Sequence, residues 1–210
     1  MADLLIFGAS RGTGHQLMTM ALKRGDHCVA VVRNQQSAEQ LNALGATTLV
    51  GDANDPITVH QACLLVGKNA TIISTLGGEK ANYQAQMNII NQAEKSAIKR
   101  MILVTSLGCG DSWSFLSERA KQAFGYSVRE KTLAESWLAT SSLNYTILRP
   151  GGLTDGEPTL QAKCYCDQEV HGYIRRSDLA SVILAHIDLA KLDNQAYLVI
   201  DPSLADKRNN

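Results

Sequence analysis

The chain has 210 residues, 45% of them apolar, and its 20 basic residues balance its 20 acidic ones. This length and composition favour one globular domain. The zero formal charge argues against nucleic acid or an anionic membrane as the main partner, because both attract basic surfaces. No apolar run approaches the roughly 18 residues of a membrane-spanning helix. The N-terminus lacks a signal-peptide pattern and the five cysteines are scattered, so we expect a cytoplasmic protein with free thiols and no metal.

Short apolar runs alternate along the chain with longer amphipathic stretches. The runs lack strict alternation, which is typical of strands buried on both faces of a parallel sheet. The predicted strands are 4–7, 28–32, 47–50, 70–74, 101–105, 145–148 and 197–200. The predicted helices are 14–24, 38–44, 57–66, 82–97, 116–140 and 178–189.

This alternation predicts an α/β fold, a single-domain Rossmann-like doubly wound parallel sheet. We expect the domain to span residues 1–205, with a frayed polar tail at 206–210. The segments 107–118 and 150–175 follow predicted strands, and we expect them to form loops around a substrate.

A glycine-rich turn joins the first predicted strand to the first predicted helix. Its three glycines permit a tight turn, a close approach of backbone N–H groups to a diphosphate, and close helix–strand packing. The helix N-terminus adds a partial positive charge under the phosphates. The alternative is a glycine-rich turn that binds nothing. The candidate phosphate-binding residues are Gly8, Ser10, Arg11, Gly12, Thr13 and Gly14.

The end of the second predicted strand indicates which dinucleotide binds. An NAD site usually has an acidic side chain there for the adenosine ribose, whereas this strand is followed by Arg33. Asp26 precedes the strand and therefore lies at its opposite end. Arg33 is placed to bind a 2′-phosphate, with Arg11 sharing the contact, because guanidinium–phosphate bonds are charge-assisted. We therefore predict NADPH as the cofactor, the alternative for Arg33 being a solvated surface arginine.

The ends of the later strands supply further candidate cofactor contacts, because open α/β sheets bind ligands at the carboxyl ends of their strands. The carboxylate of Asp52 is placed to face the adenine amine. Small residues after the fourth strand suit a close passage of the chain beside the cofactor. These candidates are Asp52, Ala53, Thr75, Leu76, Gly77, Thr105, Pro150, Gly151 and Gly152.

The spacing Gly-x3-Gly-x-Gly resembles that of the short-chain dehydrogenase/reductase superfamily. Classical members carry a serine and Tyr-x3-Lys, and this chain offers Ser106 and Lys131 as the catalytic serine and lysine. Ser127 stands where the tyrosine would be, and Tyr126 lies about 140° around the helix from Lys131. Ser127, Lys131 and Glu135 share one helical face, as a catalytic stripe or as a surface Lys–Glu pair.

Further motifs resemble the atypical branch of that superfamily over nearly the whole chain. They are Val-Thr-Ser at 104–106, Arg-Pro-Gly-Gly at 149–152 and Arg-x-Ser-Asp-Leu-Ala at 175–180. The chain is most similar to the biliverdin-reductase-B/flavin-reductase group. This resemblance implies that NADPH reduces a flavin or linear tetrapyrrole, with Ser106 beside the substrate.

A planar conjugated substrate accepts hydride readily, so a strong protein acid is not obligatory and a flat apolar slot suffices. We expect Trp113, Phe115 and Leu153, with Tyr173, to wall it, the alternative for each being an ordinary packing role. Ser177-Asp178 is interpreted as a helix N-cap. The expected partner is a small planar molecule, and the protein is expected to be a monomer or homodimer. The alternatives are an NmrA-like regulator that binds NADP without turnover, and an isomerase, epimerase or assembly factor with bound cofactor.

Overall fold

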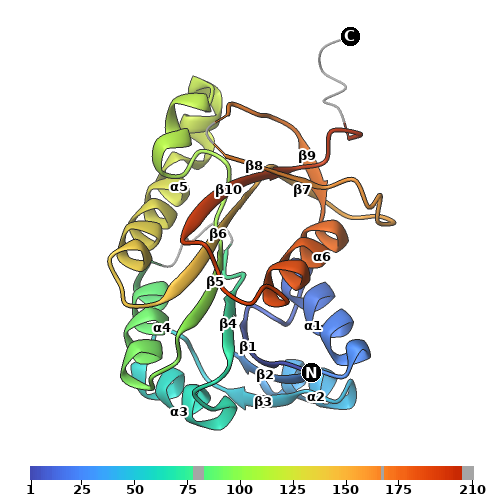
Figure 1. Cartoon of the computed structure of the whole chain (residues 1–210), viewed down its shortest axis with the longest axis vertical. Coiled ribbons are helices and arrows are strands. Elements are labelled where there is room, and N and C mark those ends of the chain that lie inside the picture. Colours follow the sequence, from blue (N-terminus) through green and yellow to red (C-terminus); the bar gives the residue numbers. More distant parts are fainter. Residues whose placement is uncertain (78–82, 167, 205–210) are drawn as a thin grey trace.

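The apolar runs of the sequence form one large, mainly parallel sheet (Figure 1). The computed structural model describes residues 1–77, 83–166 and 168–204. Its strands are β1 (Asp3–Phe7), β2 (His27–Val32), β3 (Thr47–Val50), β4 (Thr71–Ser74), β5 (Arg100–Val104), β6 (Asn144–Pro150), β7 (Gly152–Thr154), β8 (Lys163–Tyr165), β9 (Tyr173–Arg175) and β10 (Gln195–Ile200). The eight-stranded sheet has the order β3-β2-β1-β4-β5-β6-β10-β8, and β8 pairs antiparallel with β10. β7 and β9 pair in a separate small sheet.

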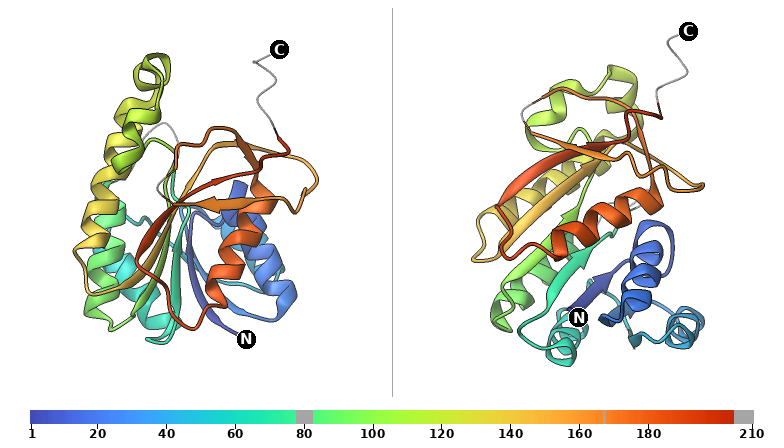
Figure 2. Two further views of the ribbon diagram at one scale, coloured as in Figure 1. Left: turned by 45° about the horizontal axis from the view of Figure 1, so that its top comes forward. Right: turned by 45° about the vertical axis from the view of Figure 1, so that its right-hand side comes forward.

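Helices cover both faces of the large sheet (Figure 2). One face carries α1 (Gly12–Arg24), α2 (Gln35–Ala43) and α6 (Arg176–Ile187). The other carries α3 (Pro56–Val66), α4 (Tyr83–Lys95) and α5 (Glu118–Ala139). Along β1, Leu4 and Ile6 pack into the first layer while Leu5 and Phe7 pack into the second. Successive strand side chains point to opposite faces, so a strand covered on both sides must be apolar throughout.

This arrangement confirms the predicted doubly wound Rossmann-like sheet. Local signals set several helix ends. Asp55 caps α3 by accepting hydrogen bonds from the backbone N–H groups of Ile57 and Thr58, and Pro56 occupies the first helical position. Gly25 ends α1 in the left-handed conformation, with a φ of 89°. Because the central strands pair in parallel, their carboxyl ends lie along one edge of the sheet.

The segment 150–175 differs from the predicted loop because it contains β7, β8 and β9. Each has three residues and is partly exposed, so no apolar run marked them in the sequence. A short 3-10 helix, η1 (Gly110–Phe115), likewise lies inside the predicted loop 107–118. The predicted tail 206–210 and the first residue of the predicted helix 82–97 lie outside the described residues.

The described part of the chain contains no helix long and apolar enough to cross a membrane. Within the same residues, no cluster of three or more His, Cys, Asp or Glu side chains is arranged to hold a metal ion. Cys28, Cys63 and Cys109 are buried, whereas Cys164 and Cys166 on and beside β8 are exposed. No disulfide joins any of them within the described residues. Burial raises the pKa of Cys28 to about 12 and that of Cys63 to about 11, which makes both poor nucleophiles at neutral pH.

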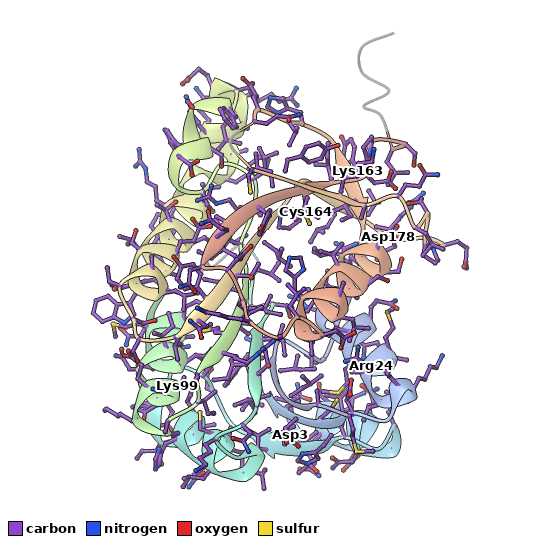
Figure 3. All side chains as sticks on the ribbon, in the orientation of Figure 1. Asp3, Arg24, Lys99, Lys163, Cys164 and Asp178 are labelled. Atoms are coloured by element: carbon purple, nitrogen blue, oxygen red, sulfur yellow. The ribbon has the colours of Figure 1, made fainter. Side chains whose placement is uncertain are left out.

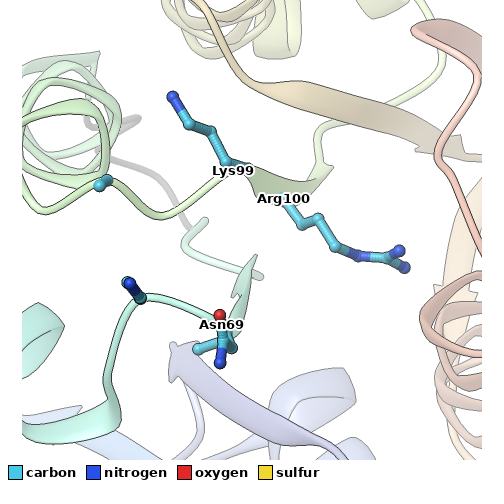
Figure 4. Close-up of a pocket in the computed structure, with 6 residues that line it drawn as sticks. Asn69, Lys99 and Arg100 are labelled. Carbon is cyan, nitrogen blue, oxygen red and sulfur yellow. The ribbon is translucent and has the colours of Figure 1, made fainter.

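A hollow of about 260 Å³ lies at the amino ends of β4 and β5 (Figure 4). Lys99 and Arg100 line it, but their side chains point in different directions. The Arg100 guanidinium donates to the carbonyls of Ile187 (3.0 Å) and Leu189 (2.9 Å), where α6 ends. Because parallel strands carry ligand sites at their carboxyl ends, this hollow is a structural junction rather than a binding site.

Candidate active site

The glycine loop is closed by contacts between its own residues and the end of β4. A Cβ atom on Gly14 would lie 2.3 Å from the Gly8 carbonyl oxygen and 2.5 Å from the Thr75 hydroxyl. That hydroxyl donates to the carbonyls of Phe7 (3.1 Å) and Gly8 (3.3 Å). Glycine is therefore required at positions 8 and 14 for this close packing. Thr75 links the loop to the neighbouring strand β4.

The loop suits the diphosphate of a dinucleotide. Gly12 opens α1 with a φ of 59°, in the left-handed region that favours glycine. Thr13 is 7% exposed, and its hydroxyl has no hydrogen-bond partner among the described residues. A buried hydroxyl without a partner is costly, and a phosphate oxygen at the helix N-terminus would satisfy it. An open cradle with an unused donor fits the predicted cofactor.

The predicted contacts to the adenosine and its 2′-phosphate lie after the carboxyl ends of β1, β2 and β3. Arg33 and Arg11 are exposed, and within the described residues neither forms an ion pair. The backbone N–H of Gly51 donates to the Val32 carbonyl (2.8 Å), which brings the two strand ends together. The Asp52 carboxylate accepts from the backbone N–H of Asn54 (2.8 Å). Both arginines are therefore accessible to a phosphate, and Asp52 already orders its own turn.

The carboxyl end of β5 holds Ser106 through its two neighbours in the chain. The backbone N–H of Thr105 donates to the Leu148 carbonyl, and that of Leu107 donates to the Pro150 carbonyl, each at 2.9 Å. These bonds continue the β5–β6 ladder past the end of β5. Ser106 lies between them with its hydroxyl 3.6 Å from the Cys109 sulfur. The backbone of the predicted catalytic serine is thus fixed from both sides.

A buried charged network stands behind this serine. Lys131 Nζ lies 3.4 Å from the Thr105 carbonyl oxygen, and the Thr105 hydroxyl donates to Glu135 (2.6 Å). Arg149 donates to the same carboxylate through Nε (3.1 Å) and Nη2 (2.8 Å), and through Nη1 to Asp111 on η1. Glu135 and Arg149 are only 5% and 7% exposed. The alternative of a surface Lys–Glu pair on α5 is therefore wrong.

The network gives Lys131 a defined environment. Burial lowers the pKa of its ammonium group below the ordinary value. Tyr126 is 72% exposed, and its hydroxyl lies 3.5 Å from Glu130 rather than near Lys131. The prediction that Tyr126 lies off the Lys131 face is therefore confirmed. Lys131 thus reaches the residue that precedes Ser106 at the end of β5, and Tyr126 on α5 does not share this position.

The side chains expected to wall a substrate slot are distributed over three elements, η1, β7 and, for Tyr173, β9. Trp113 on η1 packs against α5, with Lys121 Nζ 5.9 Å and Arg129 Cζ 5.3 Å from its ring centroid. Phe115 ends the same 3-10 helix and is half-buried. Leu153 on β7 is 38% exposed. The structure places these residues on segments next to the carboxyl edge, and their contact with a substrate stays a prediction.

The interpretation of Ser177-Asp178 as an N-cap is wrong. Arg175 precedes the first helical residue of α6, and no side chain caps it by a hydrogen bond. Asp178 is buried one turn further on and accepts from the backbone N–H groups of Thr159 (3.0 Å) and Leu160 (2.9 Å) (Figure 3). The carboxylate therefore anchors the segment between β7 and β8 to α6. The sequence carried no signal for this long-range contact.

Residues 8–189 match the family model described as NAD(P)H-binding. The chain belongs to this NAD(P)H-binding family. The matched range includes the glycine loop, β5 and the following Ser106, and the whole of α6. A nicotinamide dinucleotide is therefore the cofactor class of this chain, consistent with the atypical short-chain dehydrogenase/reductase group.

Relatives match over nearly the whole chain. The structure of ChuY from Escherichia coli O157:H7, described as an anaerobilin reductase, is 50% identical, with a TM-score of 0.94 over 97% of this chain and 98% of that one. YhfK of Bacillus subtilis, described as an uncharacterized sugar epimerase, is 27% identical over 92% of both chains. Sanguinarine reductase of Eschscholzia californica is 26% identical over 92% of this chain and 87% of its own.

Proposed function

We propose that the protein is an NADPH-dependent reductase that transfers hydride to a linear tetrapyrrole, with flavins as the second substrate class. The observation that carries this proposal is the composition of the site at the end of β5. Ser106 and Lys131 are present there, and Tyr126 points into solvent. The similarity to a protein described as an anaerobilin reductase supports the choice of a tetrapyrrole.

Because the site lacks the tyrosine acid, it suits substrates that accept hydride without a strong protein acid. A simple carbonyl develops an alkoxide that needs a positioned acid, whereas a conjugated tetrapyrrole spreads the added electron pair over many atoms. When bound, NADPH supplies the hydride, which consists of one hydrogen nucleus and two electrons, and is released as NADP⁺. The substrate takes one further proton from the Ser106 hydroxyl, which water restores, or from water directly.

The chain's own groups provide orientation and charge. Ser106 is fixed between two ladder hydrogen bonds, so its hydroxyl has a defined position relative to a substrate stacked on the nicotinamide. The Lys131 ammonium, next to the Thr105 carbonyl, favours negative charge developing on the substrate. Arg33 and Arg11 provide the preference for NADPH through its 2′-phosphate.

The test is the loss of NADPH absorbance under anaerobic conditions with biliverdin, FMN, FAD and a benzoquinone as separate acceptors. We expect turnover with biliverdin to exceed that with the other acceptors, and NADPH to be used in preference to NADH. Tight NADPH binding with no oxidation by any acceptor would contradict a reductase and favour the NADP-binding regulator. Efficient turnover of the quinone alone would contradict the tetrapyrrole assignment.

A further inference from the structure

Arg176 extends its side chain over the glycine loop. It is the first residue of α6, and α6 packs beside α1 on the same face of the sheet (Figure 1). A Cβ atom on Gly12 would lie 3.5 Å from Nε and 3.6 Å from Cδ of Arg176. The bare face of this glycine is the side from which its backbone approaches the cofactor diphosphate. The Arg176 guanidinium therefore stands where that diphosphate must arrive.

The present partner of Arg176 is an exposed acid. Its Nη1 lies 2.9 Å from Asp155 Oδ2, and the Asp155 side chain is 86% exposed. An ion pair with one solvated partner is worth little, so a better anion can replace it at small cost. A diphosphate offers several charged oxygens to a planar guanidinium, which binds such groups in a bidentate way.

The start of α1, next to Gly12, has a second feature that favours binding of an anion. The Thr13 hydroxyl is buried next to Gly12 and has no partner in the described part of the chain. Thr13 belongs to the first turn of α1, whose N–H groups are also available. Three groups that can bind an anion therefore lie around Gly12. They are the buried Thr13 hydroxyl, the N–H groups of the first turn of α1, and the Arg176 guanidinium with its exposed partner.

We propose that Arg176 is a ligand of the cofactor diphosphate and that it leaves Asp155 to bind it. This inference rests on the proposed use of a nicotinamide dinucleotide and adds a residue to its site. Because Asp155 follows β7 and Arg176 begins α6, the exchange links cofactor binding to the segment beside the predicted substrate wall. The diphosphate is common to NADPH and NADH, so Arg176 acts on both cofactors.

The test compares affinities for NADPH and NADH, measured by titration of nicotinamide fluorescence without any acceptor. Arg176→Ala should weaken both cofactors by the same factor, about 10- to 150-fold for one charge-assisted contact. Arg33→Ala should weaken NADPH alone. Arg119→Ala is the matched control, because Arg119 is exposed on α5 and away from the loop, and it should change neither affinity. Asp155→Asn should tighten both cofactors a few-fold by removing the competing carboxylate.

Three results would overturn the inference. Unchanged affinities in Arg176→Ala would show that the guanidinium does not reach the diphosphate. A loss for NADPH alone would assign Arg176 to the 2′-phosphate. Unchanged or weaker binding in Asp155→Asn would contradict the exchange. Arg176→Lys is the control for misfolding. It retains a positive charge, so it should recover part of the affinity that Arg176→Ala loses for both cofactors. Failure of the wild-type protein to reduce any acceptor would contradict the proposed function and leave these affinities unaffected.

Discussion

Replacing Arg149 by methionine tests the buried network behind Ser106. The guanidinium is 7% exposed and supplies two of the donors that hold the Glu135 carboxylate. Methionine fills much of the same volume but leaves a carboxylate, 5% exposed, without its main counter-charge. Breaking a buried ion pair by removing one partner costs about 3–5 kcal/mol. At about 2–4 °C per kcal/mol for a chain of this size, Tm should fall by about 6–20 °C.

The measurement is reversible urea unfolding followed by circular dichroism. The double variant Glu135→Met with Arg149→Met should be more stable than Arg149→Met alone, because no unpaired buried charge remains. Arg119→Met serves as the surface control and should stay within about 0.5 kcal/mol of wild type. A loss below about 1 kcal/mol in Arg149→Met, or a double variant no more stable than the single one, would refute this account of the network.

Four further predictions concern the site. Arg33→Ala should weaken NADPH by about 10- to 150-fold and leave NADH nearly unchanged in fluorescence titrations, and equal losses would contradict a 2′-phosphate contact. Gly12→Val should abolish binding of both cofactors while circular dichroism shows a folded protein, because a β-branched residue is strained at a φ of 59° and its side chain fills the diphosphate approach; retained affinity would exclude the loop as the cradle. Ser106→Ala should lower turnover by about 10²-fold or less without changing NADPH binding, as expected for one positioning or proton-relay contact. Tyr126→Phe should leave turnover unchanged, because its hydroxyl is directed to Glu130 and solvent; loss of activity there would restore the classical tyrosine mechanism.

Local patterns were enough to predict the sheet and the position of the glycine loop between β1 and α1. Strands covered on both faces are continuous apolar runs, so β1 and β2 are evident without any partner. The glycine loop is equally local, because its conformation depends on residues within one turn. The angle between Tyr126 and Lys131 follows from helical spacing alone, which is why that prediction was confirmed.

Only the tertiary structure decided which charged groups meet. Glu135 and Arg149 lie on different elements, and nothing in their spacing distinguishes a buried pair from two surface residues. Asp178 looked like a helix cap, yet it binds Thr159 because the segment between β7 and β8 folds back over α6. The strands β7, β8 and β9 are short and partly exposed, so they depend on pairing rather than on an apolar run. Arg176 lies close to Gly12 although they stand 164 positions apart in the chain. They come together because α1 and α6 bury their apolar faces side by side on one face of the sheet.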